Sequence, residues 1–199
     1  MSDTKTVMQM IKENGANYVD LRFTDPRGKW QHVTQHIETV DEEALVEGFM
    51  FDGSSIAGWK VINESDMTLM PDLETAVMDP FSAQPTLILV CDVLEPSTGQ
   101  PYERDPRSIA KKALAYLGST GIGDIAYFGP EAEFFVFDDV RFKTGMNEAY
   151  YHLDSEEGPY NSGKVYPEGN LGHRPPAKGG YFPVAPVDSG QDMRGEMLD

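Results

Sequence analysis

The chain has 199 residues, of which 40% are hydrophobic and 25% are charged. This composition is typical of a folded globular protein and excludes a disordered chain. The length suits one ordinary domain, or one small domain together with the start of another. The 33 acidic and 16 basic residues give a net charge of −17, which repels a phosphate backbone, so we expect no nucleic-acid partner.

The sequence has no segment suited to a membrane. The longest apolar run, Leu87 to Cys91, covers five residues, whereas a spanning helix requires roughly 20. The N-terminus lacks the basic and then apolar pattern of a signal peptide. We therefore expect a cytoplasmic protein with no membrane partner.

The chain begins with signals for one helix and one hairpin. Apolar residues recur at helical spacing over 4–14, and Gly15 follows in place to end the helix. Residues 18–24 alternate apolar and polar side chains, a turn follows over 25–28, and the pattern resumes at Trp30. This arrangement predicts a β-hairpin.

Shorter elements follow the hairpin. Asp41 suits the N-cap of a short helix that ends at Gly48, and residues 67–70 and 86–92 have the composition of strands. The lone cysteine, Cys91, lies in the last of these strands, where a free thiol behaves as a small hydrophobe in the core. Together these elements predict a small mixed α+β sheet domain.

A polar segment rich in turn formers, residues 95–101, suits a link between domains. We place the domain boundary near residue 100. The expected organisation is one domain over residues 1–100 and the beginning of a second domain over residues 101–199.

The second half opens with a strong helix signal. Asp105 is a suitable cap, Pro106 fits the first helical position, and Gly118 is expected to end the helix. Residues 124–128 and 131–137 then predict two strands, because Gly and Pro separate two runs of apolar residues.

The remaining chain has weaker signals. Residues 143–180 show no sustained period, which predicts a long irregular excursion. Within it, Gly169–Arg174 and Lys178–Gly180 superficially resemble a phosphate-binding loop, but the spacing differs and we interpret them as an ordinary loop. Asp188-Ser189 predicts a helix start close to the end of the sequence at Asp199, so we expect the chain to be a fragment.

Glu131 and Glu133 are the first candidate functional residues. Alternate side chains of a strand share a face, which would place the two carboxylates side by side, roughly 6.6 Å apart. Bulky apolar neighbours follow them, and unpaired anions near a buried sheet are costly. Hard oxygen ligands at this separation suit two Mg²⁺ or Mn²⁺ ions, one at each Glu. An exposed edge strand with both Glu facing water is the alternative.

The second candidate is the turn Phe51-Asp-Gly-Ser-Ser55. Gly53 can adopt positive φ there, and Asp and Ser side chains bond local backbone in such turns. Asp52 could also bind a small cation such as ammonium or take its proton, because a carboxylate accepts hydrogen bonds and ammonium only donates them. The following Asn63-Glu-Ser-Asp66 adds two carboxylates, with a solvated loop as the alternative.

Several motifs in order resemble the type I glutamine synthetases of bacteria, and the resemblance extends over essentially the whole chain. They are Phe51-Asp-Gly-Ser-Ser55 with Trp59-Lys60, Asn63-Glu-Ser-Asp66, Phe128-Gly-Pro-Glu-Ala-Glu-Phe-Phe135, Lys178-Gly-Gly-Tyr-Phe-Pro-Val184 and Val187-Asp-Ser189. The resemblance implies a β-grasp N-terminal domain to about residue 100, followed by the start of a catalytic α+β domain. It also implies a ligase that joins ammonium to glutamate with ATP and Mg²⁺ or Mn²⁺.

By position, the resemblance implies that Glu131 and Glu133 are ligands of two different divalent ions. It implies that Asp52 binds ammonium and helps to deprotonate it, with Ser54 and Asp66 beside it in less defined roles. The family's assembly is a homo-oligomer, a dodecamer of two hexameric rings, with active sites between subunits. Its remaining ligands would lie beyond residue 199.

Other functions remain open at this level. A γ-glutamyl ligase that uses an amine or polyamine would share the scaffold, and the chain alone could be a non-catalytic assembly module. Glu131 and Glu133 could also be the acid and base of an inverting glycoside hydrolase, although neighbours on one strand rarely flank a substrate.

Overall fold

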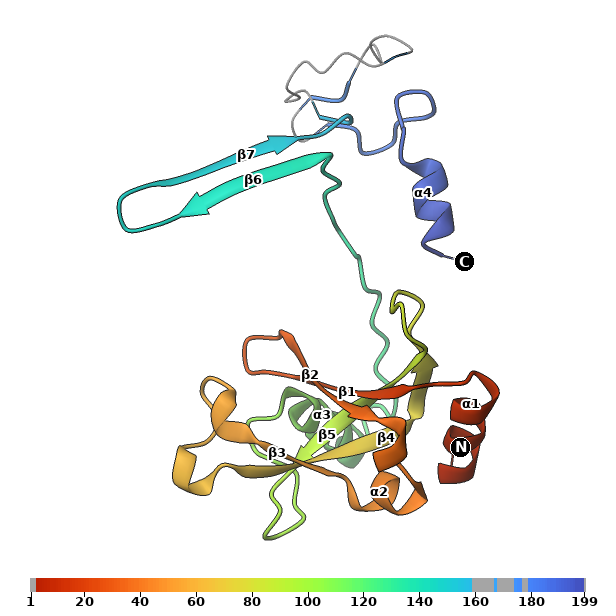
Figure 1. The fold of residues 1–199 in the computed structure, drawn as a ribbon, viewed down its shortest axis with the longest axis vertical. Helices are drawn as coiled ribbons and strands as arrows, with labels where there is room; N and C mark the ends of the chain where they lie inside the picture. Colours follow the sequence, from red (N-terminus) through yellow and green to blue (C-terminus); the bar gives the residue numbers. More distant parts are fainter. Residues whose placement is uncertain (1–2, 159–166, 168–173, 177–178, 199) are drawn as a thin grey trace. The chain divides into compact units, whose positions relative to one another are not determined.

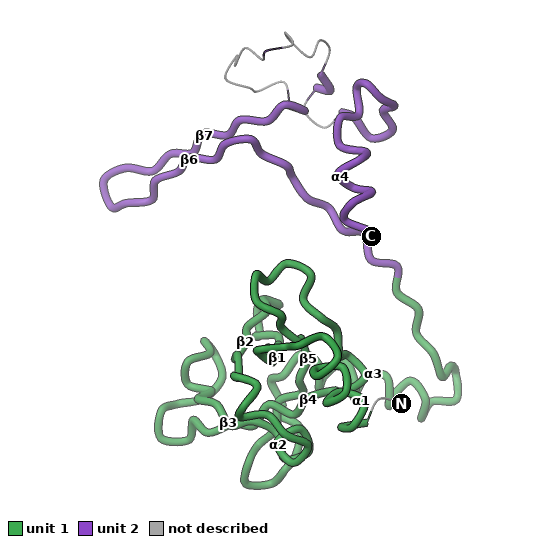
Figure 2. Tube along the Cα trace, turned by 45° about the vertical axis from the view of Figure 1, so that its right-hand side comes forward, with its two compact units in different colours: residues 1–128 green, residues 129–199 purple. Residues whose placement is uncertain are grey.

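The computed structural model of the chain describes residues 3–158, 167, 174–176 and 179–198. The chain divides into two compact units, Met1–Phe128 and Gly129–Asp199, which have different colours in Figure 2. Each unit is described by itself. No helix in the described ranges is both long enough and apolar enough to cross a bilayer.

A five-stranded mixed sheet forms the centre of the first unit, with the strand order β2-β1-β5-β4-β3 (Figure 1). Its strands are β1 (Tyr18–Thr24), β2 (Trp30–His36), β3 (Phe49–Asp52), β4 (Asp66–Met78) and β5 (Thr86–Leu94). β1 pairs with β5 in parallel and all other pairs are antiparallel. The predicted hairpin and the mixed α+β sheet are therefore confirmed.

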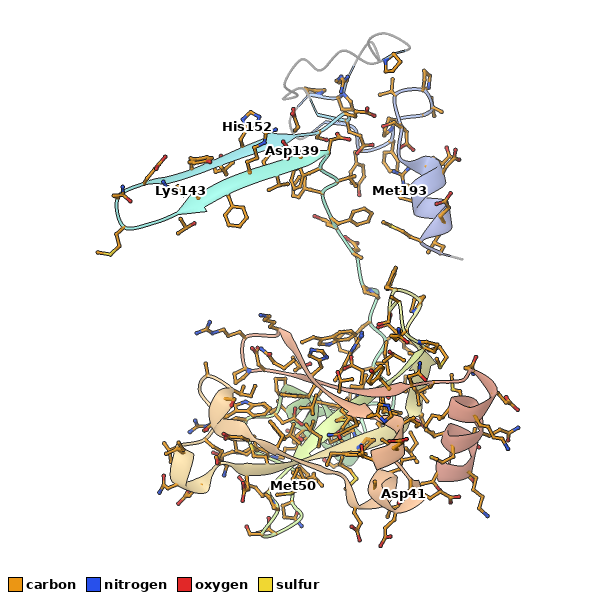
Figure 3. The ribbon with its side chains drawn as sticks, in the orientation of Figure 1. Asp41, Met50, Asp139, Lys143, His152 and Met193 are labelled. Atoms are coloured by element: carbon orange, nitrogen blue, oxygen red, sulfur yellow. The ribbon has the colours of Figure 1, made fainter. Side chains whose placement is uncertain are left out.

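The helices in the first unit are α1 (Thr4–Glu13), α2 (Glu42–Glu47) and α3 (Pro106–Thr120), with short 3₁₀ helices at Ile37–Thr39, Gly53–Ser55 and Ile62–Glu64. Of these, α2 and α3 begin at the side-chain caps predicted from the sequence. Asp41 (Figure 3) caps α2 by accepting a hydrogen bond from the Ala44 N–H at 2.8 Å. The helix ends at Gly48, whose φ of 84° favours glycine.

The core of this unit lies between α1, α2 and one face of the sheet. Alternate β1 residues Val19, Leu21 and Phe23 are buried there with Val7 and Ile11 of α1. The face of β5 that lies on the same side of the sheet contributes four more core residues: Leu87, Leu89, Cys91 and Val93. The prediction that Cys91 is a core residue is confirmed, since its side chain is fully buried and its thiol is free.

β4 is longer than predicted: it stays in register with β5 through Pro71 and Asp72, and a register shift between Asp72 and Val77 then lets it continue to Met78. The shifted segment is held by Thr75, whose Oγ1 accepts a hydrogen bond from the Val90 N–H at 2.8 Å. A proline has no N–H for the ladder, so the sequence suggested that the strand stops there.

α3 begins where the sequence predicts but ends later. Asp105 accepts hydrogen bonds from the Ser108 N–H at 3.0 Å and from its hydroxyl at 2.6 Å. The helix passes through Gly118 and ends before Gly121, whose φ is 67°. The prediction of Gly118 as the end was wrong because a glycine within a helix costs only about 1 kcal/mol, whereas Gly121 has the left-handed conformation that ends helices.

α3 is fixed to the other face of the sheet by charge. The Arg107 Nε donates to Asp92 Oδ1 at 2.8 Å, and the same guanidinium pairs with Asp72. Asp92 follows the core residue Cys91 on β5, and successive side chains of a strand point to opposite faces. The Asp92 side chain therefore projects from the face of the sheet opposite the core. These bonds join α3 to strands β4 and β5 in one unit.

The predicted strands at 124–128, at the end of the first unit, and at 131–137, in the second unit, were wrong: none is formed within 124–137. An antiparallel hairpin of β6 (Asp139–Thr144) and β7 (Ala149–Asp154) occurs instead, partly within the stretch expected to be irregular. A strand requires a hydrogen-bonding partner, and only the hairpin finds a local one. Figure 3 labels Asp139 and Lys143 on β6 and His152 on β7.

The last helix, α4 (Gln191–Glu196), follows Asp188-Ser189 as predicted. Its N-cap is Gly190 rather than either of these residues. The Asp188 carboxylate accepts a hydrogen bond from the Gly190 N–H at 3.1 Å and also pairs with Arg194. Of the predicted loop, residues 169–173 and 178 lie outside the described residues.

A buried acid on the polar face of the sheet provides a stability test. Asp20 is 5% exposed and accepts hydrogen bonds from Thr34 Oγ1 at 2.7 Å and Arg22 Nε at 2.8 Å, with His32 Nδ1 2.6 Å away. Burial alone would raise the pKa of Asp20, but the hydrogen bonds from Arg22, His32 and Thr34 outweigh it and lower the pKa.

We expect Asp20→Asn to lower the free energy of unfolding by about 2–3 kcal/mol, because the neutral amide leaves Arg22 with a weaker partner. Denaturant unfolding of the chain would measure it, with Glu38→Gln, an 86% exposed acid, as the neutral control. Because the folded pKa of Asp20 is below its ordinary value, the stabilisation is complete above about pH 4 and is lost as the pH falls through the folded pKa. A difference between variant and parent that persisted at the lowest pH would contradict this account.

Candidate functional site

The turn after β3 holds the Asp52 carboxylate in one position. Asp52 caps the 3₁₀ helix Gly53–Ser55, and its Oδ1 accepts hydrogen bonds from the Ser54 N–H at 2.8 Å and the Ser54 hydroxyl at 2.6 Å. The hydroxyl bond, followed by the backbone bond, lowers the pKa of Asp52. The carboxylate is therefore ionised at neutral pH, and Asp52 is exposed.

Gly53 is required in this turn for a reason that differs from the prediction. It is not among the glycines with positive φ. A Cβ at Gly53 would lie 2.4 Å from Met67 Sδ and 2.8 Å from Met67 Cγ. The Gly53 N–H also donates to the Ser65 carbonyl at 2.7 Å. Close backbone approach to a buried methionine thus excludes a side chain here.

We expect Gly53→Ala to lower the free energy of unfolding by about 1–3 kcal/mol, because the added methyl group must displace the fully buried Met67. Gly118→Ala is the matched control. No atom lies within 4 Å of a Cβ added at that helical position, so this variant should gain about 0.5–1 kcal/mol. Thermal or urea unfolding would measure both, and equal effects would contradict the packing argument.

Asp66 lies directly opposite Asp52 in the β3–β4 ladder. Directly opposed residues project from the same face with Cβ atoms about 4.5–5.5 Å apart, where like charges repel. Both residues are exposed. The pair presents acceptor oxygens at the edge of the sheet, an arrangement that can receive a small hydrogen-bond donor cation.

An open hollow of about 470 Å³ adjoins this edge. Its lining includes Ser65 from the loop, Asp66 from the start of β4 and Glu95 from the segment after β5. The hollow therefore combines two acidic groups with Ser65, the residue just before β4.

Aromatic packing anchors the loop between Asp52 and Asp66. Trp59 is 6% exposed, and its ring lies 5.5 Å from that of Phe23, 6.1 Å from that of Phe51 and 5.5 Å from that of Tyr102. Because these rings belong to the core of the sheet, the loop cannot move independently of it.

Two polar contacts complete the anchor. The Lys60 Nζ lies 2.6 Å from Glu95 Oε1, and an Arg104 Nη1 donates to the Gly58 carbonyl at 2.8 Å. Sequence reasoning missed Glu95 and Arg104 as supporting residues, because their partners are more than 30 positions away. The only local sign of this anchor in the sequence was the Trp59-Lys60 pair within a polar loop.

Glu131 and Glu133 lie in the second unit, on a segment that forms no strand. Both are exposed, and their neighbour Phe135 is 80% exposed. Within the described part of the chain, no three or more His, Cys, Asp or Glu residues converge as metal ligands. Carboxylate oxygens are the donors that Mg²⁺ and Mn²⁺ prefer, so the two residues fit such an ion chemically but would need further ligands.

A larger open hollow in the same unit, about 610 Å³, is lined in part by Phe134 and Phe135. Asp188 and Arg194, which form an ion pair, also line it. The structure thus brings together Asp52, Ser54 and Asp66 in one unit and places Glu131 and Glu133 in the other.

Comparison with known proteins identifies the chain's relatives. Residues 15–96 match the β-grasp domain of glutamine synthetase, and residues 103–199 match the catalytic domain of the same enzyme. The chain belongs to the glutamine synthetase family. A glutamine synthetase of Azospirillum brasilense is 69% identical over 198 residues, 100% of this chain and 42% of the relative. The chain therefore spans about 42% of the length of that relative.

Two further comparisons extend this result. A protein of Cupriavidus pinatubonensis named 3-hydroxylaminophenol mutase is 58% identical over 191 residues, 96% of this chain and 41% of that protein. The cryo-electron microscopy structure of Plasmodium falciparum glutamine synthetase matches 99% of this chain and 39% of that chain, with a TM-score of 0.79 and 22% identity. The predicted fold class, a β-grasp domain followed by the start of a catalytic domain, is confirmed.

Proposed function

We propose that the full-length protein is a glutamine synthetase, which joins ammonia to L-glutamate with ATP and gives glutamine, ADP and phosphate. The observation that carries this proposal is the ionised, exposed Asp52 carboxylate, fixed by Ser54 within a chain that matches both domains of the family in order. The chain described here spans part of that enzyme, and we expect it to be inactive alone.

The chemistry has two steps. In the first, an oxygen of the glutamate side-chain carboxylate bonds to the γ-phosphorus of ATP, and the bond to ADP breaks. In the second, the nitrogen of ammonia bonds to the acyl carbon of the γ-glutamyl phosphate, and phosphate leaves. Ammonium has no lone pair, so it must lose a proton to become ammonia before its nitrogen can attack.

Asp52 is suited to the second step. Because its pKa is lowered, it remains an anion that accepts hydrogen bonds from ammonium and concentrates it at the site. One of its oxygens can accept a proton from ammonium, which frees the nitrogen lone pair for the attack. Asp66, directly opposite on β4, adds a second negative charge that favours a cation there.

Glu131 and Glu133 would each hold one Mg²⁺ or Mn²⁺ ion in the full-length enzyme. When bound, these ions neutralise negative charge between the nucleotide phosphates and the glutamate carboxylate. The family resemblance and the carboxylate chemistry support this assignment. The preferred metal is a question for titration.

We further propose that the enzyme is cytoplasmic and assembles as a dodecamer of two hexameric rings, with active sites between subunits. Exposure of both Asp52 and Asp66 supports a role at a neighbouring subunit. A domain boundary near residue 100 also belongs to this proposal. It falls between the two matched family domains, which end at residue 96 and begin at residue 103.

The direct test is a product assay on the full-length protein with glutamate, ATP, ammonium and Mg²⁺ or Mn²⁺. We expect glutamine, ADP and phosphate in equal amounts. Replacing ammonium with methylamine or a polyamine tests the related amine ligases. Activity with the amine but none with ammonium would overturn the proposal.

A further inference from the structure

The two hydrogen bonds from Ser54 converge on one oxygen of Asp52. The backbone N–H lies 2.8 Å and the hydroxyl 2.6 Å from Oδ1. We propose that Ser54 is a positioning residue, which fixes the Asp52 carboxylate so that its other oxygen receives ammonium. This inference rests on the proposed function and assigns Ser54 a role through Asp52 rather than direct chemistry on the substrate.

The hydrogen-bonding capacity of Ser54 supports this role. A serine hydroxyl has one proton to donate, and Ser54 donates it to Asp52. It therefore has no proton left for a substrate carboxylate or phosphate. Two donors from one residue on a single oxygen also restrict rotation of the carboxylate, which fixes the direction in which its second oxygen points.

The backbone that carries Ser54 is itself fixed. The Gly53 N–H donates to the Ser65 carbonyl at 2.7 Å, and Gly53 lies against the fully buried Met67. A rigid turn of this kind positions the hydroxyl before any ligand arrives. Preorganised hydrogen bonds are effective because they need not reorganise when the ligand binds.

The same contacts set the charge of Asp52. The Ser54 hydroxyl is the largest cause of its lowered pKa, followed by the Ser54 N–H, while the Ser65 hydroxyl contributes less. The charged group directly opposite on β4 is Asp66, which opposes ionisation. Removing the Ser54 hydroxyl should therefore return the pKa of Asp52 toward its ordinary value.

The experiment uses the full-length enzyme and the variants Ser54→Ala and Ser54→Thr. We expect Ser54→Ala to raise KM for ammonium roughly tenfold, as expected for a mispositioned group, with little change in KM for ATP or glutamate. The acid limb of kcat/KM for ammonium should move to higher pH. Ser54→Thr, which keeps the hydroxyl, should restore both values.

Two comparisons separate positioning from general damage. Hydroxylamine, a neutral nucleophile that needs no anionic site, should react at nearly the parent rate in Ser54→Ala. Ser82→Ala removes a similar hydroxyl bond, to Asp79 Oδ2 at 3.1 Å, and should change no KM. Should Ser54→Ala fail to assemble, Ser54→Cys keeps the side-chain size with a weaker donor and serves in its place.

The results distinguish this inference from the proposed function. A parent enzyme that makes no glutamine would overturn the proposed function. If the parent is active but Ser54→Ala leaves KM for ammonium unchanged, or raises KM for every substrate equally, the positioning role is wrong. A shift confined to ammonium and reversed by threonine supports it.

Discussion

Asp52→Asn in the full-length protein should reduce ammonium-dependent glutamine synthesis by about a hundredfold to a thousandfold. Asparagine has nearly the same shape and can accept the Ser54 hydrogen bonds through its Oδ1. It is neutral, however, and its amide group presents donors to ammonium, which is itself only a donor. General base catalysis and electrostatic stabilisation each contribute about this much to enzyme rates.

Asp41→Asn is the matched control for this variant. Asp41 is also an exposed carboxylate that accepts a backbone hydrogen bond at 2.8 Å from the start of a helix, and asparagine is an equally good cap. We expect this control to keep parental activity. Steady-state rates at several ammonium concentrations, together with Mn²⁺ titration, would measure the effects. Equal losses of activity and metal binding in Asp52→Asn would indicate a folding defect rather than a missing base.

Local signals in the sequence were sufficient for most of the first unit. The hairpin of β1 and β2 follows from alternation and a turn, and α2 and α3 begin at Asp41 and Asp105 because these caps act within three residues. Such elements depend on neighbours along the chain. They can therefore be predicted without knowledge of the tertiary structure.

The errors occur where distant parts of the chain decide the structure. Residues 124–137 have apolar composition but form no strand, since pairing requires a partner that composition does not specify. β4 continues through Pro71 to Met78 because it finds pairing partners on β5 on both sides of a register shift. The role of Gly53 depends on Met67, a neighbour only after β3 and β4 pair.

The candidate site likewise has some features that the local sequence indicates and others that depend on distant residues. Asp52 and Ser54 are two residues apart, and their turn was predictable in outline from residue type. The opposition of Asp52 and Asp66 depends on the register of β3 and β4, and the anchoring of Trp59 depends on rings from three other segments. These contacts attach the loop to the sheet, which no local pattern indicates.

Glu131→Gln and Glu133→Gln should each weaken Mg²⁺ or Mn²⁺ binding by the full-length enzyme at least about tenfold, because an amide replaces a charged oxygen ligand. Glutamine synthesis should fall by about a hundredfold in each variant, since charge neutralisation at the transferring phosphoryl group is lost. Calorimetric titration with Mn²⁺ would measure the binding, and added metal should partly restore activity.

The double variant tests whether the two residues hold different ions. If each Glu binds its own ion, each single variant weakens one binding event and the double variant weakens both. If both residues bind one ion, each single variant already weakens the same binding event, and the double variant leaves any second binding event unchanged.

Glu148→Gln, which removes an ion pair with Lys143 at the exposed β6–β7 hairpin, should leave metal binding unaffected. Unchanged titrations in both Glu131→Gln and Glu133→Gln would exclude these residues as ligands, because a carboxylate that holds a divalent ion cannot lose its charge without loss of affinity.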